Sequence, residues 1–317
     1  MKIIYSILML LLTGSVAFSC DYCNCYLGLN PQYKKNTIGI RYHYMNYTGT
    51  HESEMELQEM GLSKDEFWET RTRAELHGQW YATPKLKIIF SAPYVINKEG
   101  IHDNGEHQSH SGADQPMTHE TETINGIGDP LAIAHYQVFN FTGDSLHFSQ
   151  RLFAGGGIKF PIGKWKLEEG EEAHERVHQP GTGSWDFILS TEYLAKYKRT
   201  GMNVNLSYLI PTTNSQSYRF ANRFNANMVF YYQVNAKETS IYPSIGTYFE
   251  QAGNDMDENT SVENSGGTIL YAHAGIDFYF KNFSINTALQ LPATQHLNQP
   301  QPEMKYRCIA GITYSFN

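Results

Sequence analysis

The chain has 317 residues, is 41% hydrophobic and carries a formal net charge of −8 at pH 7. The negative charge, and a sequence without a glycine-rich phosphate loop between a strand and a helix, argue against a nucleotide-binding or nucleic-acid-binding protein. The 22 Tyr and 17 Phe against only 12 Pro favour pleated strands and membrane interfaces. The mean hydropathy of −0.46 is compatible with a membrane protein, since only alternate residues of a transmembrane strand face lipid.

The first residues have the features of a secretory signal peptide. Lys2 is followed by the apolar run 3–12 and then by small residues up to Ser19. This run is too short for a spanning helix, which needs about 20 apolar residues. We therefore predict a signal peptide over 1–19, a Cys-containing periplasmic segment or plug over 20–35, and a single β-barrel domain over 36–317.

Alternation with a period of two predicts the strands. In the last segment one face carries Tyr306, Cys308, Ala310, Ile312, Tyr314 and Phe316. The other face carries Lys305, Arg307, Gly311, Thr313 and Ser315. One face suits lipid and the other a polar lumen. Segments of this kind predict twelve strands, near 37–47, 70–82, 86–97, 127–139, 147–160, 185–198, 202–212, 218–234, 240–251, 268–281, 283–294 and 304–316.

Short and long connections alternate strictly along the chain. The short turns lie at 83–85, 140–146, 198–201, 235–239 and 281–282. The long, mostly polar stretches lie at 48–69, 98–126, 161–184, 213–217, 252–267 and 295–303, and the acids collect in four of them, within 51–69, 98–125, 164–184 and 254–267. This layout is typical of outer-membrane barrels. We predict an all-β, transmembrane, antiparallel up-and-down barrel in a bacterial outer membrane, with long loops extracellular and both termini periplasmic. Outer-membrane lipids and a small-molecule solute are the expected partners, and the oligomeric state is open.

Several short motifs carry a family resemblance. They are Gly126-Ile127-Gly128-Asp129-Pro130, the strand ends Ala92-Pro93-Tyr94, Phe160-Pro161-Ile162-Gly163, Ile210-Pro211-Thr212 and Leu291-Pro292-Ala293, and the terminus 311–317. With them the chain resembles the "MetA pathway of phenol degradation" family of transporter-like outer-membrane barrels. Its Cys-rich head and final Asn317 resemble the Bacteroidetes versions. The resemblance implies a channel, with hydrophobic or aromatic compounds as expected cargo.

The alternation predicts which charged side chains project into the lumen. Such charges either pair and rigidify the barrel or line a path that favours anions or polar solutes. The predicted lumen-lining residues are Arg41, His43, Arg71, Arg73, Glu75, His77, Asp129, Arg151, Lys159, Glu192, Arg219, Arg223, Glu250, Asp277 and Arg307.

Histidines and acids gather in loop 98–126, and they form a candidate metal site. Imidazole and carboxylate groups at close spacing are ligands for zinc, copper or nickel. The spacing of His102, His107, His110 and His119 matches no defined metal motif. Two interpretations stay open for this loop: an ordinary polar loop, or transient capture of a divalent metal. No other cofactor is expected.

Three cysteines surround the predicted cleavage point. Cys20 could be lipidated, or it could form a disulfide or a soft-metal site together with Cys23 and Cys25. Cys308 falls on the predicted lipid face as a small apolar filler.

Three functions compete on these patterns: a channel or transporter for small solutes, a metal-binding barrel, and a structural barrel without transport. An enzyme is not expected. A lipid hydrolase would need Ser and His on the lipid face, whereas His43, His77, His135 and His273 are predicted to point inward.

Overall fold

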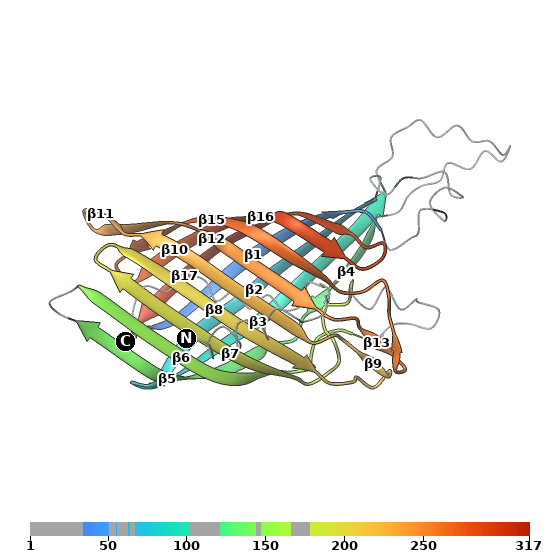
Figure 1. Ribbon diagram of the computed structural model, residues 1–317, viewed down its shortest axis with the longest axis horizontal. Coiled ribbons are helices and arrows are strands. Elements are labelled where there is room, and N and C mark those ends of the chain that lie inside the picture. The colour runs from blue at the N-terminus through green and yellow to red at the C-terminus, as the bar shows by residue number, and fades with distance from the viewer. Residues whose placement is uncertain are drawn as a thin grey trace, which may run out of the picture.

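The computed structural model describes residues 34–50, 55, 63, 67–101, 121–143, 147–165 and 178–317. Twelve long strands form the wall of a barrel (Figure 1). They are β1 (Asn36–Thr48), β2 (Phe67–Thr83), β3 (Leu86–Ile101), β5 (Leu131–Gly143), β6 (Phe148–Lys159), β7 (Asp186–Tyr197), β8 (Thr200–Pro211), β10 (Arg223–Tyr232), β12 (Thr239–Ala252), β15 (Gly267–Phe280), β16 (Phe283–Leu297) and β17 (Glu303–Phe316).

Five short strands complete the set within these residues. They are β4 (Glu122–Ile127), β9 (Tyr218–Arg219), β11 (Val234–Ala236), β13 (Met256–Asp257) and β14 (Thr260–Ser261). β4 extends the pairing of β3, and β9, β13 and β14 form a separate small sheet. Within the same part of the chain, no helix is long and apolar enough to cross a membrane.

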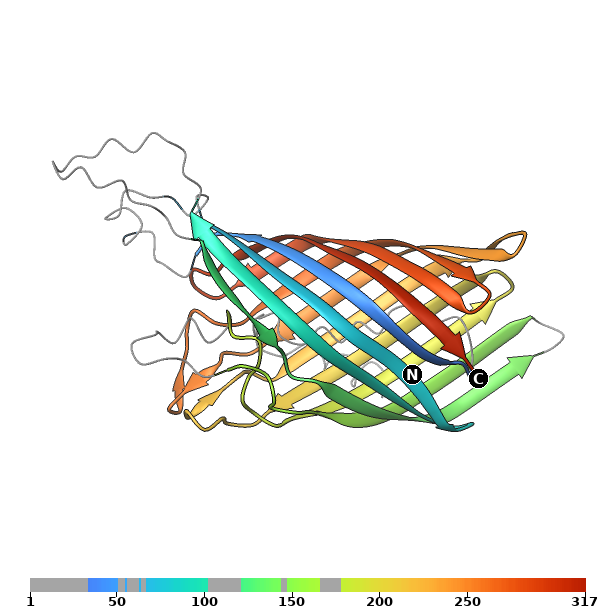
Figure 2. The ribbon, with the colours of Figure 1, turned by 180° about the vertical axis from the view of Figure 1, so that it is seen from behind.

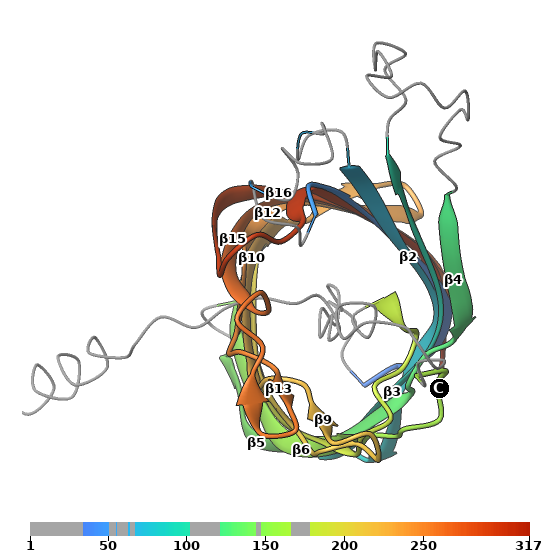
Figure 3. The ribbon, with the colours of Figure 1, turned by 90° about the vertical axis from the view of Figure 1, so that its right-hand side faces the viewer.

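The barrel is closed because its first and last strands pair. β1 lies antiparallel to β17, with Asn36 opposite Phe316 and Thr48 opposite Glu303. Figure 2 shows these blue and red strands side by side, and Figure 3 shows the strands as a ring. Each of the other long strands also pairs antiparallel with its neighbour in the sequence. Closure leaves no sheet edge whose backbone N–H and C=O groups would lack hydrogen-bond partners in hydrocarbon. The predicted all-β fold of twelve antiparallel strands is confirmed.

The two faces of the wall differ in polarity. Large apolar side chains are exposed on the outer face, among them Ile245 at 69% and Ile40 at 62%. Cys308 is exposed on the same face. Interior positions between them are buried and mostly polar, as in β8, where Asn203 and Asn205 alternate with outward Val204 and Leu206. A barrel surrounded by lipid requires this distribution, apolar outside and polar inside.

The connections define two ends of the barrel. At the short-turn end, the hairpins after β7, β11 and β15 each place a lysine at positive φ: Lys198 (52°), Lys237 (55°) and Lys281 (49°). At the long-loop end, β2 and β3 reach beyond their neighbours (Figure 1). The ends of β1 and β17 that lie nearest the termini are both at the short-turn end.

Two predicted strands differ from the structure. The segment predicted at 127–139 is interrupted at 128–130 and continues as β5 down to Gly143, while the preceding residues form β4. The segment predicted at 218–234 is divided into β9, β10 and β11. At the second place the carboxylate of Asp255 accepts the Ala221 N–H, a donor that a continuous strand would use in its ladder. At the first, the interruption contains Asp129, whose carboxylate accepts from the Gly163 and Thr182 N–H groups of a later connection.

Apolar clusters also occupy part of the interior. One joins Ile89, Ile133, Ile188 and Leu209 on β3, β5, β7 and β8. The intervening β6 has glycines there, and a Cβ added at Gly157 would collide with the backbone of Ala132. A second cluster joins Met45, Tyr47, Tyr248, Ile269, Tyr271 and Met304. In the ring order the two clusters lie on opposite sides of the barrel.

Candidate functional site

The interior contains a set of paired charges that connects strands far apart in the ring. Basic and acidic side chains there are buried, and most acids contact a base. Buried ion pairs with further hydrogen bonds hold their groups in fixed positions, whereas lone buried charges are costly. These pairs form the candidate site, because any solute that enters the barrel meets them.

One group is centred on Glu75 of β2. Its Oε1 lies 3.2 Å from Nη1 of Arg41 and 3.4 Å from Nε2 of His43. Ser91 donates its hydroxyl to Oε2 at 2.8 Å, and Nη2 of Arg41 lies 3.2 Å from Nδ1 of His77. Side chains from β1 and β3 therefore satisfy both oxygens of one buried carboxylate on β2.

A second pair crosses the interior between β3 and β7. The ammonium of Lys87 donates to Oε2 of Glu192 in a buried contact. β5 and β6 separate these strands in the ring, so the contact can form only on the inner side. Phe153 of β6 lies beneath, with its ring centroid 4.3 Å from Nζ of Lys87. His135 of β5 is fully buried next to this pair.

A third group is centred on Arg307 of β17, which is fully buried. Its Nη2 donates to Oε1 of Glu250 at 3.0 Å, and its Nη1 donates to Oε1 of Gln290 at 3.1 Å. The rings of Tyr248 and Tyr271 lie 5.4 and 4.7 Å from the guanidinium carbon. Glu250 belongs to β12, so this group also bridges strands that are not neighbours.

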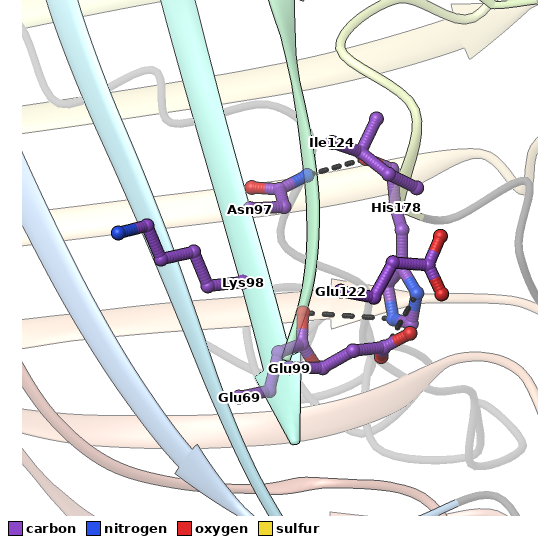
Figure 4. Close-up of a pocket in the computed structure, with 7 residues that line it drawn as sticks. All are labelled: Glu69, Asn97, Lys98, Glu99, Glu122, Ile124 and His178. Atoms are coloured by element: carbon purple, nitrogen blue, oxygen red, sulfur yellow. Dashed lines mark hydrogen bonds and ion pairs between the residues drawn. The ribbon is translucent and has the colours of Figure 1, made fainter. Parts of the chain in front are cut away.

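At the long-loop end, the segment His178–Ser184 is held against the inner wall; we call it the entrance segment. Nδ1 of His178 lies 3.2 Å from Glu99, and Nε2 lies 3.6 Å from Glu69. Asn97 donates its amide to the His178 carbonyl at 2.5 Å (Figure 4). These groups line a shallow cleft together with Lys98, Glu122 and Ile124. Burial alone would lower the pKa of His178, but the carboxylates of Glu69 and Glu99 outweigh it and raise the pKa to about 9.

The other end of the entrance segment is fixed by Asp129. Its Oδ2 accepts hydrogen bonds from the backbone N–H and the hydroxyl of Thr182, both at 2.8 Å, and its Oδ1 accepts from Gly163 N–H at 2.9 Å. Lys159 lies 3.6 Å from Asp129 and contacts Asp186 directly. The segment is therefore attached to β2, β3, β6 and β7 together, and it narrows the long-loop end of the barrel.

A separate buried carboxylate organises the loops beyond β10 and β12. Asp255 accepts from Tyr218 OH at 2.7 Å and from Ala221 N–H at 2.8 Å, and its own N–H donates to Ser265 at 2.9 Å. Burial raises the pKa of Asp255, and nearby Arg223 opposes that rise. This carboxylate connects the small sheet to the barrel wall.

Not all of the predicted lumen residues face the interior of the barrel. Arg219 is exposed in the two-residue β9, so its assignment to a lumen-facing strand was wrong. Lys305 is exposed because a register shift opposite Asn46 and Tyr47 turns it outward. Asp129 is buried but lies in the connection before β5. The buried or half-buried residues on the inner face of the barrel strands are Arg41, His43, Arg71, Arg73, Glu75, His77, Arg151, Lys159, Glu192, Arg223, Glu250, Asp277 and Arg307.

Several members of the paired set were not among the predicted lumen residues. Lys87 follows the same alternation as Ile89 and Ser91, so that pattern could have identified it. Glu69 lies one residue before the predicted start of its strand. His178 gave no signal beyond its place in a polar loop.

The metal and thiol predictions concern residues outside the described ranges. This applies to His102, His107, His110 and His119, and also to Cys20, Cys23 and Cys25. Within the described residues, no group of three His, Cys, Asp or Glu side chains is arranged to hold a metal ion.

Comparisons with known proteins agree with the architecture. No family model matches the chain, and no curated protein matches it. An outer-membrane channel from Pseudomonas putida F1 is similar, with a TM-score of 0.61 at 14% identity over 94% of this chain and 100% of that one. The β-domain of the Bordetella autotransporter BrkA has a TM-score of 0.47 at 9% identity, over 89% of this chain and 100% of that one. A Pseudomonas aeruginosa FadL homologue has a TM-score of 0.39 at 11% identity, over 90% of this chain and 91% of that one.

At these low identities the similarity shows the fold alone. Of the three structures, the P. putida channel, with its TM-score of 0.61, supports that conclusion. The predicted resemblance to the phenol-degradation family stays a prediction. The closed ring, the apolar outer face and the similar architecture together show that the chain has the fold of an outer-membrane β-barrel.

Proposed function

We propose that the protein is a passive outer-membrane channel for small polar solutes. Its long loops would face outside and its short turns and both termini the periplasm, as in other barrels with this layout. The observation that carries the proposal is the polar inner face, which includes the buried groups around Glu75 and Arg307. Such pairs would also rigidify a purely structural barrel, so measured transport is what distinguishes the two functions.

The entrance segment supports a size-selective channel. His178 and Thr182 attach it to the inner wall through Glu69, Glu99 and Asp129. A fixed segment at one end of a barrel narrows the passage permanently and does not open and close as a gate would. The pore would therefore admit small solutes and exclude large ones.

The polar interior favours polar cargo over hydrophobic or aromatic compounds. A hydrophobic solute crossing the barrel would displace water from buried amides and charges without replacing its hydrogen bonds. Among the residues that the structure describes, the apolar side chains of the interior form separate clusters and not one continuous path.

Reconstitution tests the proposal. The barrel, refolded into planar bilayers, should give discrete conductance steps in KCl, and liposomes containing it should swell in a small neutral sugar faster than protein-free liposomes. Swelling should slow as the solute grows. A barrel that migrates as a folded species on gels but neither conducts nor admits solutes would refute the channel and favour a structural role.

Metal capture by loop 98–126 stays a separate prediction. Zinc and copper titrations of the wild type and of a variant with His102, His107, His110 and His119 replaced by Ala would test it. Equal binding by the two proteins would exclude this loop as the site.

A further inference from the structure

Neighbouring strands β8 and β10 present a stripe of uncharged polar side chains to the interior; we call it the amide wall. It consists of Asn203, Asn205 and Ser207 on β8 and Asn225 and Asn227 on β10, each no more than 7% exposed. Register places Asn205 directly opposite Asn227, and Ser207 opposite Asn225. Five polar side chains therefore form one continuous surface.

The amide wall carries no charge, unlike the inner faces of β1, β2, β3 and β7. β8 contains no Asp, Glu, Lys, Arg or His, and in β10 Arg223 alone is charged, at the end nearest the long loops. In the ring order β8 and β10 stand opposite β1 and β2, which carry Arg41 and Glu75. A solute in the barrel would meet paired charges on one side and amides on the other.

Three buried atoms of the amide wall lack hydrogen-bond partners among the described residues. Asn205 donates to Oδ1 of Asn203 at 2.7 Å, but Nδ2 of Asn203 and Oδ1 of Asn205 and Asn227 have no hydrogen-bond partner. Buried amide atoms without a protein partner are few in native proteins, so three on one surface are unusual. A molecule that pairs with one donor and two acceptors must itself both donate and accept.

Tyrosines border the amide wall along its β12 side and at its short-turn end. Tyr248 lies beside Asn227 in register, and its hydroxyl is 3.4 Å from Oδ1 of Asn225. Towards the short-turn end, Tyr231 and Tyr242 contact edge to face at 5.7 Å between centroids. Aromatic rings offer an apolar surface with a polar hydroxyl at its edge.

We propose that the amide wall is the solute-recognition site of the channel, and that its ligand is a neutral, hydroxyl-rich molecule such as a monosaccharide or disaccharide. The proposal rests on the proposed function. A hydroxyl both donates and accepts, so several hydroxyls on one molecule match the unpaired amide atoms of Asn203, Asn205 and Asn227. The tyrosine rings would contact the C–H faces of such a ring. An ionic solute would find no opposite charge on this surface and would lose hydration without compensation.

Current block in planar bilayers tests the inference, with maltose as the probe and gluconate as a charged polyol of comparable chemistry. Maltose should reduce the KCl current saturably, whereas gluconate should show no saturation. The variant Asn205→Ala/Asn227→Ala should raise the half-blocking maltose concentration at least tenfold. That factor follows because one lost hydrogen bond is worth about tenfold in affinity. The variant Asn205→Ser/Asn227→Ser keeps a donor and an acceptor at each site, so its half-blocking concentration should stay within about threefold of the wild type.

A matched control lies on another wall. Asn286 of β16 is an interior asparagine that accepts from Ser284 at 3.4 Å. Asn286→Ala should leave the half-blocking concentration of maltose unchanged. An equal effect of Asn286→Ala and the double alanine variant would overturn the inference, because interior polarity in general would then explain the block.

The outcomes separate this inference from the proposed function. If the wild type conducts but maltose and gluconate reduce the current equally and without saturation, the channel proposal stands and the sugar site is overturned. Water would then be the partner of the amides. If the wild type does not conduct, the channel proposal fails, and calorimetric titration of the detergent-solubilised barrel with maltose decides the binding claim. No heat of binding would then overturn it. Should the alanine variant misfold, the comparison of maltose with gluconate on the wild type still supports or overturns the sugar site.

Discussion

His178 should act as a charged latch that holds the entrance segment to the barrel wall. The difference between a pKa of about 9 in the fold and 6.5 for an ordinary histidine corresponds to about 3 kcal/mol of local stability. Because the folded pKa is the higher one, this contribution is complete below about pH 6.5 and is lost as pH rises through about 9. The groups that face the imidazole are Glu69, Glu99 and Arg71, with the carboxylates prevailing.

The substitution His178→Gln should remove this contribution at neutral pH. Glu69 keeps Arg71 as a partner and the Glu99 side chain is partly open to solvent, so neither carboxylate is left buried alone. Opening of the segment should become about a hundredfold more frequent, since 1.36 kcal/mol is a factor of ten. The protection factor of the amides at 178–184, measured by hydrogen exchange against unstructured peptides at the same pH, should fall by that factor at pH 7.

The pH profile and a control sharpen the test. The protection factor of the wild type should approach that of His178→Gln above about pH 9. His296→Gln, at an exposed histidine near the long-loop end of β16, should change nothing at any pH. Equal protection in the wild type and His178→Gln at pH 7, or protection in the wild type that is constant from pH 7 to pH 10, would refute the latch.

Other predictions follow from the two faces of the wall. Arg307→Met should lower the free energy of unfolding in urea by about 3–5 kcal/mol because Glu250 loses its buried partner; a change below about 1 kcal/mol would contradict the importance of this pair. Ile312→Lys, on the exposed outer face, should cost about 2–4 kcal/mol on folding into liposomes if the strand crosses lipid, and an unchanged value would argue against that exposure. Paired interior charges predict weak ion selectivity in reversal-potential measurements. Glu192→Gln, which leaves Lys87 unpaired, should shift the selectivity towards anions; a shift towards cations would contradict the pairing.

The barrel was predictable from sequence because its strands obey a local rule. A strand with lipid on one side and a polar interior on the other must alternate, and the predicted 283–294 accordingly begins at the same residue as β16, Phe283–Leu297. The alternation fails where a distant side chain takes a backbone hydrogen bond or where the strand register shifts. Residues 220–222 leave the ladder because Asp255, more than thirty residues away, takes the Ala221 N–H. Lys305 faces outward because the register shifts opposite it.

The candidate site was predictable only in part, for a different reason. Alternation indicates which side chains point inward, but not which of them meet. Glu75 contacts residues of adjacent strands. In contrast, Lys87 and Glu192 are 105 positions apart, and their pairing depends on the curvature of the wall between β3 and β7. The contact of His178 with Glu69 depends on the path of a long connection, which no local pattern specifies.

In the proposed channel, the bridging pairs would restrict what the barrel admits. Neighbouring strands are already held by backbone hydrogen bonds, so an ion pair between them adds little to the shape of the wall. Lys87–Glu192 and Arg307–Glu250 instead join strands three places apart, and each therefore spans a chord of the ring. A chord occupies the space through which a solute would pass and resists widening of the wall. Neither pair involves β8 or β10, so a neutral solute at the proposed amide-wall site would compete with no bridging charge on those strands.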